Sequence, residues 1–175
     1  MADPVDARHG LAGTAHALLE RHVLQPWFPR CIDRVHGGYH CDFDHAWRRS
    51  AAPSPRFLEF QARQTRVAAL GFRLHPDSTF WRECLLHGWL FLSQTMWDAA
   101  EGGWYALCDA DGTPRSGRRK HMHGTTYVLQ ACLDVHQLLG IARARELVDE
   151  TIAWSLAHAW VPQACAFRGW LERNG

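Results

Sequence analysis

The chain has 175 residues, of which 47% are apolar and 21% are charged, a length and composition typical of one globular domain. Its 19 Lys and Arg nearly balance its 18 Asp and Glu, and the net charge of +1 gives no field that would gather nucleic acid. Apolar runs such as residues 85–92 fall far short of the roughly 20 residues that a membrane span needs. These features disfavour a nucleic-acid partner and a membrane-spanning protein.

The start of the chain and its cysteines indicate the cell compartment. Residues 1–6 are acidic and lack the apolar run behind a basic front that marks a secretory signal. The 6 cysteines are scattered without a C-x-x-C pair, and several lie on apolar helical faces, which favours buried, reduced thiols. We therefore expect a cytoplasmic protein.

Tryptophan and histidine are frequent, with 9 and 12 residues. Indole and imidazole rings together suit a cavity that stacks on and hydrogen-bonds a polar, ring-shaped ligand. Packing of the core is the alternative, and it accounts for most of these rings.

Hydrophobic periodicity predicts that the chain is mainly helical, with five helices. The first covers residues 11–23 and ends where Pro26 and Pro29 interrupt the pattern. The second begins at Ser54-Pro55, a preferred cap and first-turn pair, and ends at His75-Pro76. Both boundaries rest on proline, which lacks the N–H of a helix interior.

The remaining three helices follow at short intervals. Asp77 or Ser78 caps the third, whose apolar stripe continues to Met96. The fourth covers residues 121–139, with Gly140 as its C-terminal stop. The fifth has an apolar side over residues 144–159 that includes Ile152. We expect the second and fourth helices to line a concave inner face and the other three to lie outside.

Two segments between the helices repeat each other. Residues 36–39 and 101–104 share a Gly-Gly-aromatic pattern, and in each an aspartate follows further along, at the same distance from the first glycine. The first glycines, Gly37 and Gly102, define a period of about 65 residues, and a further step of the same length leads to a degraded third copy at Phe167. A helix pair with a Gly-Gly-led hairpin, repeated at this period, predicts tandem helical hairpins in one domain over residues 1–175.

These motifs resemble the N-acylglucosamine 2-epimerase family, which includes cellobiose 2-epimerases and mannose-type aldose-ketose isomerases. The similarity rests on residues 30–39, on Gln61-Ala62-Arg63, and on residues 101–112 with Lys120 ahead of an aromatic-containing helix. It implies an all-α (α/α)₆ toroid of helical hairpins with short β-hairpins in the connections and a sugar site at one end. The sequence supplies about the first half of such a ring, and the acid-base histidines of the family's later helices have no counterpart up to Gly175.

The activity that the resemblance implies is 2-epimerisation of a sugar or aldose–ketose isomerisation, by proton transfer through an enediolate. Such a reaction needs a base near neutral pKa and a donor for the enediolate oxygen. Arg63 starts on the same helical side as Val67 and Leu70, so we expect it to face inward, where an arginine needs a carboxylate or an anionic ligand. A salt bridge to Glu59 would satisfy it, whereas the resemblance gives Arg63 the catalytic, carbonyl-binding role.

Two further residues, His123 and Tyr127, are expected to bind the sugar, which is the expected small-molecule partner. His123 stands where the family's Lys-x-x-Tyr-Gly motif has tyrosine, and it can still bond a sugar hydroxyl. On a helix His121 and His123 would point about 200° apart, so we expect no shared metal. The implied reaction needs neither a metal nor a redox cofactor.

Two other functions stay open. A glycoside hydrolase or lyase on a similar ring would use Asp42 and Asp44, or Asp109 and Asp111, as its acid pair, although these aspartates are more typical of turns. A helical-repeat module could bind carbohydrate without catalysis.

The expected half ring leaves the first and fifth helices each without a neighbour. Apolar side chains on such edges promote association. We therefore expect these residues alone to associate, in the simplest case as a homodimer. We also expect them to be inactive, because the acid-base histidines that the resemblance implies fall beyond Gly175.

Overall fold

A computed structural model of the chain describes residues 4–50, 52, 54–115, 117 and 119–175, and its helices follow one another in the order that the sequence predicts. Residues 1–3, part of the acidic start behind the cytoplasmic prediction, lie outside the described residues. The helices are α1 (Pro4–Leu19), the π-helical η1 (Glu20–Leu24), α2 (Gln25–Arg30), α3 (Leu58–Leu74), α4 (Thr79–Phe91), the π-helical η2 (Leu92–Met96), α5 (Met122–Leu139), α6 (Ala142–His158) and the 3₁₀ turn η3 (Pro162–Ala164).

The strands of the described residues are short and form antiparallel pairs. Strand β1 (Arg56–Phe57) pairs with β2 (Leu107–Cys108), and β3 (Lys120–His121) pairs with β6 (Trp170–Leu171). Strand β4 (Trp160–Val161) pairs with β5 (Ala166–Phe167) in a local hairpin. Strands β1 and β3 stand directly ahead of α3 and α5, so each of these helices enters from a strand.

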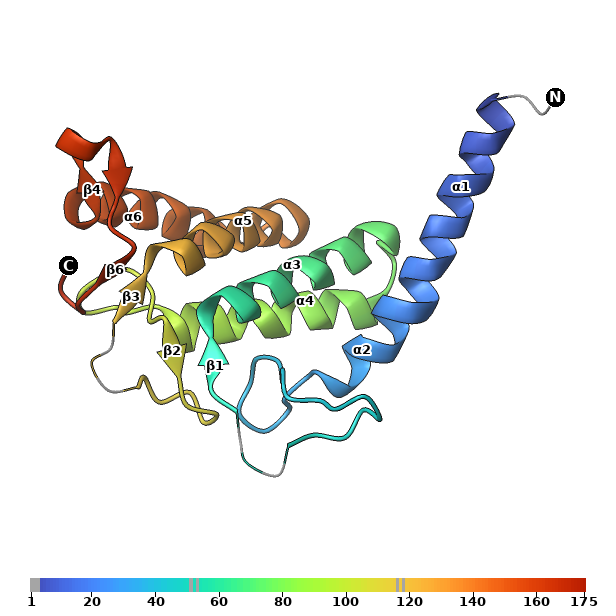
Figure 1. Cartoon of the computed structure of the whole chain (residues 1–175), viewed down its shortest axis with the longest axis horizontal. Coiled ribbons are helices and arrows are strands. Elements are labelled where there is room, and N and C mark those ends of the chain that lie inside the picture. Colours follow the sequence, from blue (N-terminus) through green and yellow to red (C-terminus); the bar gives the residue numbers. More distant parts are fainter. Residues whose placement is uncertain (1–3, 51, 53, 116, 118) are drawn as a thin grey trace.

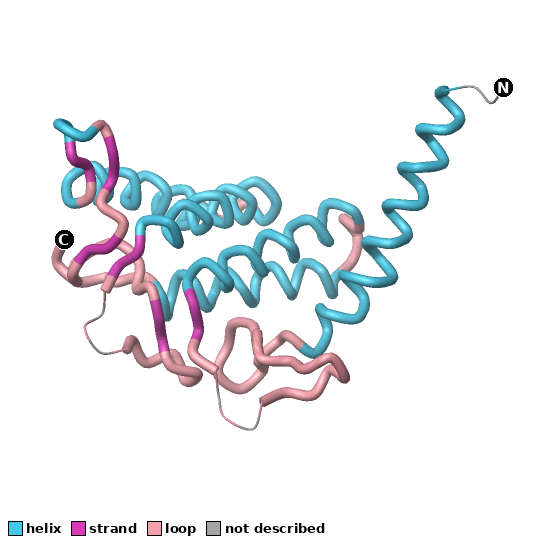
Figure 2. The backbone as a smooth tube through the Cα atoms, viewed as in Figure 1, coloured by secondary structure: helices cyan, strands magenta, loops and turns pink. Residues whose placement is uncertain are grey.

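The helices α3 and α5 pack against each other, α4 packs on α3, and α6 packs on α5 (Figure 1). The strands and the long loop after α2 lie at the end of the structure where α3 and α5 begin (Figure 2). Helix α1 projects away from this body (Figure 1). The expected fold class, helical hairpins of an incomplete α/α toroid with short strands in the connections, is confirmed.

Several predicted helix features are confirmed. Ser78 caps α4, where its hydroxyl accepts a hydrogen bond from the Trp81 amide at 3.4 Å. Gly140 ends α5 in the left-handed region, at φ 67°. The stripe on α4 and η2 is buried along its whole length: Trp81, Cys84, Leu85, Trp89, Leu92 and Met96.

Other predicted bounds were wrong for identifiable reasons. The helical run does not stop before Pro26. The π turn of η1 leads directly into α2, which holds Pro26 in its first turn and Pro29 in its interior, and the run ends at Arg30. Helix α3 begins at Leu58 and not at Ser54-Pro55, because Arg56–Phe57 pairs with β2 instead. On α6, Ile152 is 45% exposed, and Trp154 takes the buried place.

The repeated turns share one bridge geometry. Ile32 faces Tyr39 and Trp97 faces Trp104 across antiparallel bridges, so both bridge partners recur at the interval that separates Gly37 from Gly102. In the third copy Trp160 pairs with Phe167, with the same number of residues between the partners as in the first two turns. This pair comes slightly earlier in the chain than the period requires, so the third turn does not begin at Phe167 as predicted. Cys165 stands there in place of the first glycine and adopts a left-handed φ of 47°.

The prediction of free, buried cysteines is confirmed for four of the six side chains. All six cysteines are free, and Cys31, Cys84, Cys108 and Cys132 are buried, whereas Cys165 is exposed. Burial raises the pKa of Cys132 to about 12, so that thiol stays protonated. Among the described residues, no helix combines the length and the apolar character needed to cross a bilayer.

The packing of α4 on α3 depends on a glycine. A Cβ on Gly88 would lie 2.5 Å from the Tyr39 hydroxyl oxygen and closer still to Thr65 Oγ1. Both neighbours are buried and held, since the Tyr39 hydroxyl donates to the Cys84 carbonyl at 2.7 Å and Thr65 donates to the Gln61 carbonyl.

We expect Gly88→Ala to destabilise the protein by about 1–3 kcal/mol, because overpacking forces buried neighbours to shift. The matched control is Gly13→Ala on α1, where nothing lies within 4 Å of the added methyl group. That change should stabilise slightly through helix propensity. Thermal unfolding followed by circular dichroism measures both, and equal midpoints would contradict the close packing at Gly88.

Candidate active site

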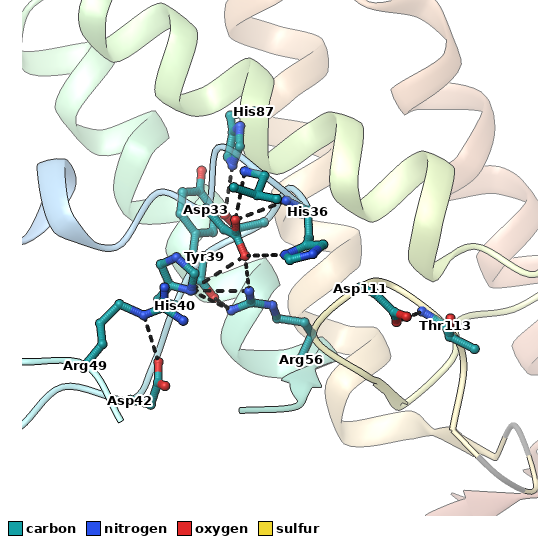
Figure 3. Close-up of polar contacts among 12 residues, drawn as sticks. Asp33, His36, Tyr39, His40, Asp42, Arg49, Arg56, His87, Asp111 and Thr113 are labelled. Atoms are coloured by element: carbon teal, nitrogen blue, oxygen red, sulfur yellow. Dashed lines mark hydrogen bonds and ion pairs between the residues drawn. The ribbon is translucent and has the colours of Figure 1, made fainter. Parts of the chain in front are cut away.

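The first Gly-Gly turn is closed around the buried carboxylate of Asp33 (Figure 3). Its Oδ1 accepts hydrogen bonds from the amides of Val35 and His36 at 2.9 and 3.0 Å. Its Oδ2 pairs with the guanidinium of Arg56, which is 1% exposed and also donates to the Tyr39 carbonyl at 2.9 Å. Because Arg56 is the first residue of β1, this ion pair fixes the turn next to the start of α3.

The second Gly-Gly turn repeats this arrangement around Asp98. Its Oδ1 accepts from the amides of Ala100 and Glu101, both at 3.2 Å. The buried cation is now Lys120 of β3, whose Nζ lies 3.4 Å from Oδ2, and Arg173 adds a hydrogen bond at 2.8 Å. Burial alone would raise the pKa of Asp98, but Arg173 and the Glu101 amide hold it well below its ordinary value.

The residues of the Gln-Ala-Arg motif have different roles: Gln61 and Ala62 are buried in the structure, and Arg63 is exposed at the site. Gln61 is buried, and its side-chain amide accepts from the Tyr39 N–H at 2.7 Å and donates to the Tyr39 carbonyl at 2.8 Å. Ala62 is buried in the core. Arg63 is exposed on the other side of α3. The motif therefore ties α3 to the first turn with one residue and presents a cation with another.

The three predicted site residues lie together on the face formed by α3 and α5. The guanidinium carbon of Arg63 lies 4.1 Å from the centre of the Tyr127 ring, a cation–π contact. The Tyr127 ring meets the His123 ring edge to face at 5.2 Å. Arg63 and His123 are accessible to solvent and Tyr127 is half-buried, so all three can be reached by a ligand.

The alternative role of Arg63, a salt bridge to Glu59, is not observed. Glu59 pairs with His121 instead. Glu59 Oε2 lies 3.5 Å from His121 Nδ1. The same imidazole stacks on Trp170 at 4.1 Å with an interplanar angle of 14°. These three residues line a cavity of about 300 Å³ between the strands and the start of α3. A carboxylate, an imidazole and an indole at one cavity are suited to binding a polyhydroxylated ring.

The predicted angle between His121 and His123 was also wrong. Their ring centres are 5.7 Å apart on the same side, because His121 belongs to β3 and precedes the first turn of α5. Within the described part of the chain, no three His, Cys, Asp or Glu side chains meet in a way that could hold a metal ion.

Three of the four aspartates of the hydrolase alternative have structural partners. The buried Asp42 carboxylate accepts no hydrogen bond from the described residues, and Arg49 Nε lies 3.8 Å from its Oδ1. Asp44 accepts from the amides of Ala46 and Arg48, and Asp111 accepts from the Thr113 amide at 2.9 Å, as residues in turns do. Asp109 pairs with Arg115 at the surface. The turn role of these three aspartates is confirmed.

Trp170 and the Glu59–His121 pair are the site features that the sequence did not indicate. Trp170 reaches His121 through the pairing of β6 with β3, two strands that lie far apart in the sequence. No local pattern marks such a contact. Glu59 lies one helical turn before Arg63, so helical spacing alone predicts that these two residues pair.

His40 is a buried titratable group next to the first turn. Both terminal nitrogens of Arg56 approach its Nδ1 at 3.2 Å, and a guanidinium only donates, so Nδ1 accepts and the ring is neutral. Burial lowers the pKa of His40 below its ordinary value, and Asp33 opposes this shift only in part. As pH falls through about 6.5, the unfolded chain binds a proton that the folded chain does not.

The free energy of unfolding should therefore fall as pH drops below about 6.5, and His40→Asn should reduce this loss. Asparagine keeps an acceptor near the position of Nδ1 but does not titrate. His45→Asn, in the exposed part of the same loop, is the control. Urea unfolding at pH 7.5 and 5.5 gives the comparison, and a wild-type pH dependence in His40→Asn would contradict the assignment.

Comparison with known proteins places this geometry in a family. The sequence profile of N-acylglucosamine 2-epimerase (GlcNAc 2-epimerase) matches residues 37–174. That range includes both Gly-Gly pairs, the Gln-Ala-Arg motif and the face formed by α3 and α5, whereas Asp33 of the first turn precedes it.

Solved structures share the fold. The cellobiose 2-epimerase of Bacillus thermoamylovorans is 17% identical with a TM-score of 0.86, over 95% of this chain and 42% of its own. The cellobiose 2-epimerase of Spirochaeta thermophila is 22% identical with a TM-score of 0.86, over 95% and 40%. A D-mannose isomerase is 24% identical with a TM-score of 0.73, over 85% and 36%. The chain thus spans less than half the length of the epimerases it matches.

Proposed function

The chain belongs to the N-acylglucosamine 2-epimerase family, and we propose on that premise that it binds a free sugar or oligosaccharide for 2-epimerisation or aldose–ketose isomerisation. The observation that carries the proposal is the contact of Arg63, Tyr127 and His123 on one accessible face, beside the Glu59–His121 pair. In this proposal residues 1–175 form one incomplete toroid domain.

The reaction proceeds by proton transfer through an enediolate. Arg63 orients the substrate carbonyl and stabilises the oxyanion that forms when the neighbouring proton leaves, because its planar donors are fixed and always charged. Contact with the Tyr127 ring restricts the guanidinium. His123 and Tyr127 bond sugar hydroxyls and so hold the reacting carbon next to Arg63.

The acid-base histidines of the family stand on later helices that have no counterpart in these residues. Proton transfer needs a base on the reacting face of the enediolate. We therefore propose that the 175-residue chain binds the sugar but does not turn it over by itself.

Arg63→Ala should weaken binding of mannose or cellobiose, measured by ligand-observed NMR on the 175-residue chain. In any longer form that turns sugar over, the same change should lower kcat on the order of 100-fold or more, as the loss of an oxyanion donor does. Arg82→Ala, an exposed arginine on α4, is the control. Sugar binding that is unchanged in Arg63→Ala would remove Arg63 from the site.

The open side of α5 and α6 should make the chain associate. A groove of about 370 Å³ there is lined by exposed apolar side chains that include Ile152, Leu156 and Phe167. Size-exclusion chromatography with light scattering should show a homodimer or larger species, and Leu156→Glu should shift it toward monomer. A stable monomer that isomerises mannose or epimerises cellobiose would contradict both the association and the inactivity.

A further inference from the structure

Another hollow lies along the α3–α5 face and is bordered by Arg63 and Tyr127. Its volume is about 470 Å³. Three arginines of α3 border it, Arg63, Arg66 and Arg73, and their helical spacing places them on one side of the helix. The carboxylate of Asp134 on α5 lies opposite. The proposed sugar chemistry uses Arg63 and Tyr127, but it gives no role to Arg66, Arg73 or Asp134.

The hollow carries more positive than negative charge. Asp134 is 7% exposed and accepts from Arg66 Nε at 3.1 Å and from Arg73 Nη2 at 2.6 Å. One carboxylate is therefore shared by two guanidinium groups. Arg63 contacts the Tyr127 ring and has no ion pair with any carboxylate of the described residues. Two of the three positive charges are left without a counter-charge.

The same arginines keep unused hydrogen-bond donors. Arg66 donates through Nε to Asp134 and through Nη1 to Gln130, and Arg73 donates through Nη2 alone, to Asp134 and Gln137. Each guanidinium has five N–H groups. Within the described residues, Nη2 of Arg66 and both Nε and Nη1 of Arg73 have no protein acceptor, and the two side chains are 43% and 45% exposed.

We propose that this hollow binds a phosphate group. Two uncompensated charges match the charge of about −1.5 to −2 that a phosphate monoester carries near pH 7, whereas a carboxylate carries one. Arginine suits phosphate because its fork donates two parallel hydrogen bonds to adjacent oxygens. Gln130 and Gln137 are neutral, so they hold the arginines without cancelling their charge.

The phosphate has two possible sources, free phosphate and a sugar phosphate. Arg66 follows Arg63 by about 4.5 Å along the helix axis, so an open-chain sugar phosphate with its carbonyl at Arg63 can reach Arg66 with its phosphate. This second source rests on the proposed function, whereas free phosphate does not.

The experiment is a titration of the 175-residue chain by isothermal calorimetry at low ionic strength with three probes: inorganic phosphate, mannose 6-phosphate and mannose. We expect inorganic phosphate to bind and its affinity to fall roughly tenfold or more in Arg66→Gln and in Arg73→Gln, since a charge-assisted hydrogen bond is lost in each. Arg145→Gln, an exposed arginine on α6 paired with Asp149, should leave phosphate affinity unchanged.

A gain of affinity separates binding from folding. Asp134→Asn removes the competing charge and keeps an acceptor for one arginine, so phosphate should bind several-fold more tightly in this variant. A variant that had lost its fold could not show this gain. Circular dichroism of each variant checks its helix content.

The probes distinguish the two sources. Mannose 6-phosphate that binds more tightly than phosphate, with the excess lost in Arg63→Ala, identifies a sugar phosphate as the ligand. Equal binding of the two identifies free phosphate, and the site stands even if mannose does not bind and the proposed function fails. No phosphate binding, or binding unchanged in both Arg66→Gln and Arg73→Gln, would overturn the proposal.

Discussion

Each of the two helices that form the candidate site begins beside a buried ion pair. Asp33 meets Arg56 ahead of α3, and Asp98 meets Lys120 ahead of α5. In both cases one carboxylate oxygen closes a Gly-Gly turn by accepting two backbone amides, and the other oxygen neutralises the cation. Removing one partner of such a pair leaves a buried charge, at a cost of about 3–5 kcal/mol. That is a large part of the total stability of a typical domain, so turn, strand and helix start are held together.

These ion pairs determine where along the axes of α3 and α5 the site residues lie. Arg56 and Lys120 open the strands that lead directly into Leu58, the first residue of α3, and Met122, the first residue of α5. Arg63 and Tyr127 then come at the same position within their helices. Since both helices start from equivalent ion pairs, the two side chains reach the same level, and they meet in a cation–π contact. The repeat therefore has a chemical consequence, because it brings a cation and an aromatic ring together from two different helices.

Local physics explains which parts of this structure the sequence could predict. The apolar stripe of α4 and the left-handed Gly140 depend on neighbours within a few residues, and both were predicted correctly. The true start of α3 and the position of Trp170 depend on strand pairs between segments that are distant in the chain, which no periodicity reveals. Arg63 shares a side of α3 with Val67 and Leu70, as its spacing predicts, but the expected inward orientation was wrong, because this side is open to solvent. Helical spacing alone did not reveal the partner of Glu59, which is His121 on strand β3 and not Arg63.

The most direct measurement is a double-mutant cycle on the first ion pair, with Asp33→Asn, Arg56→Met and the double variant compared by urea unfolding. Asparagine keeps the acceptor for the turn amides and methionine keeps much of the apolar stem, so the cycle isolates the charge interaction. The account predicts a coupling free energy of about 1–3 kcal/mol, with the double variant less destabilised than the sum of the single variants. Single effects that add to within about 0.5 kcal/mol would show that the turn and the start of α3 are not held by this pair.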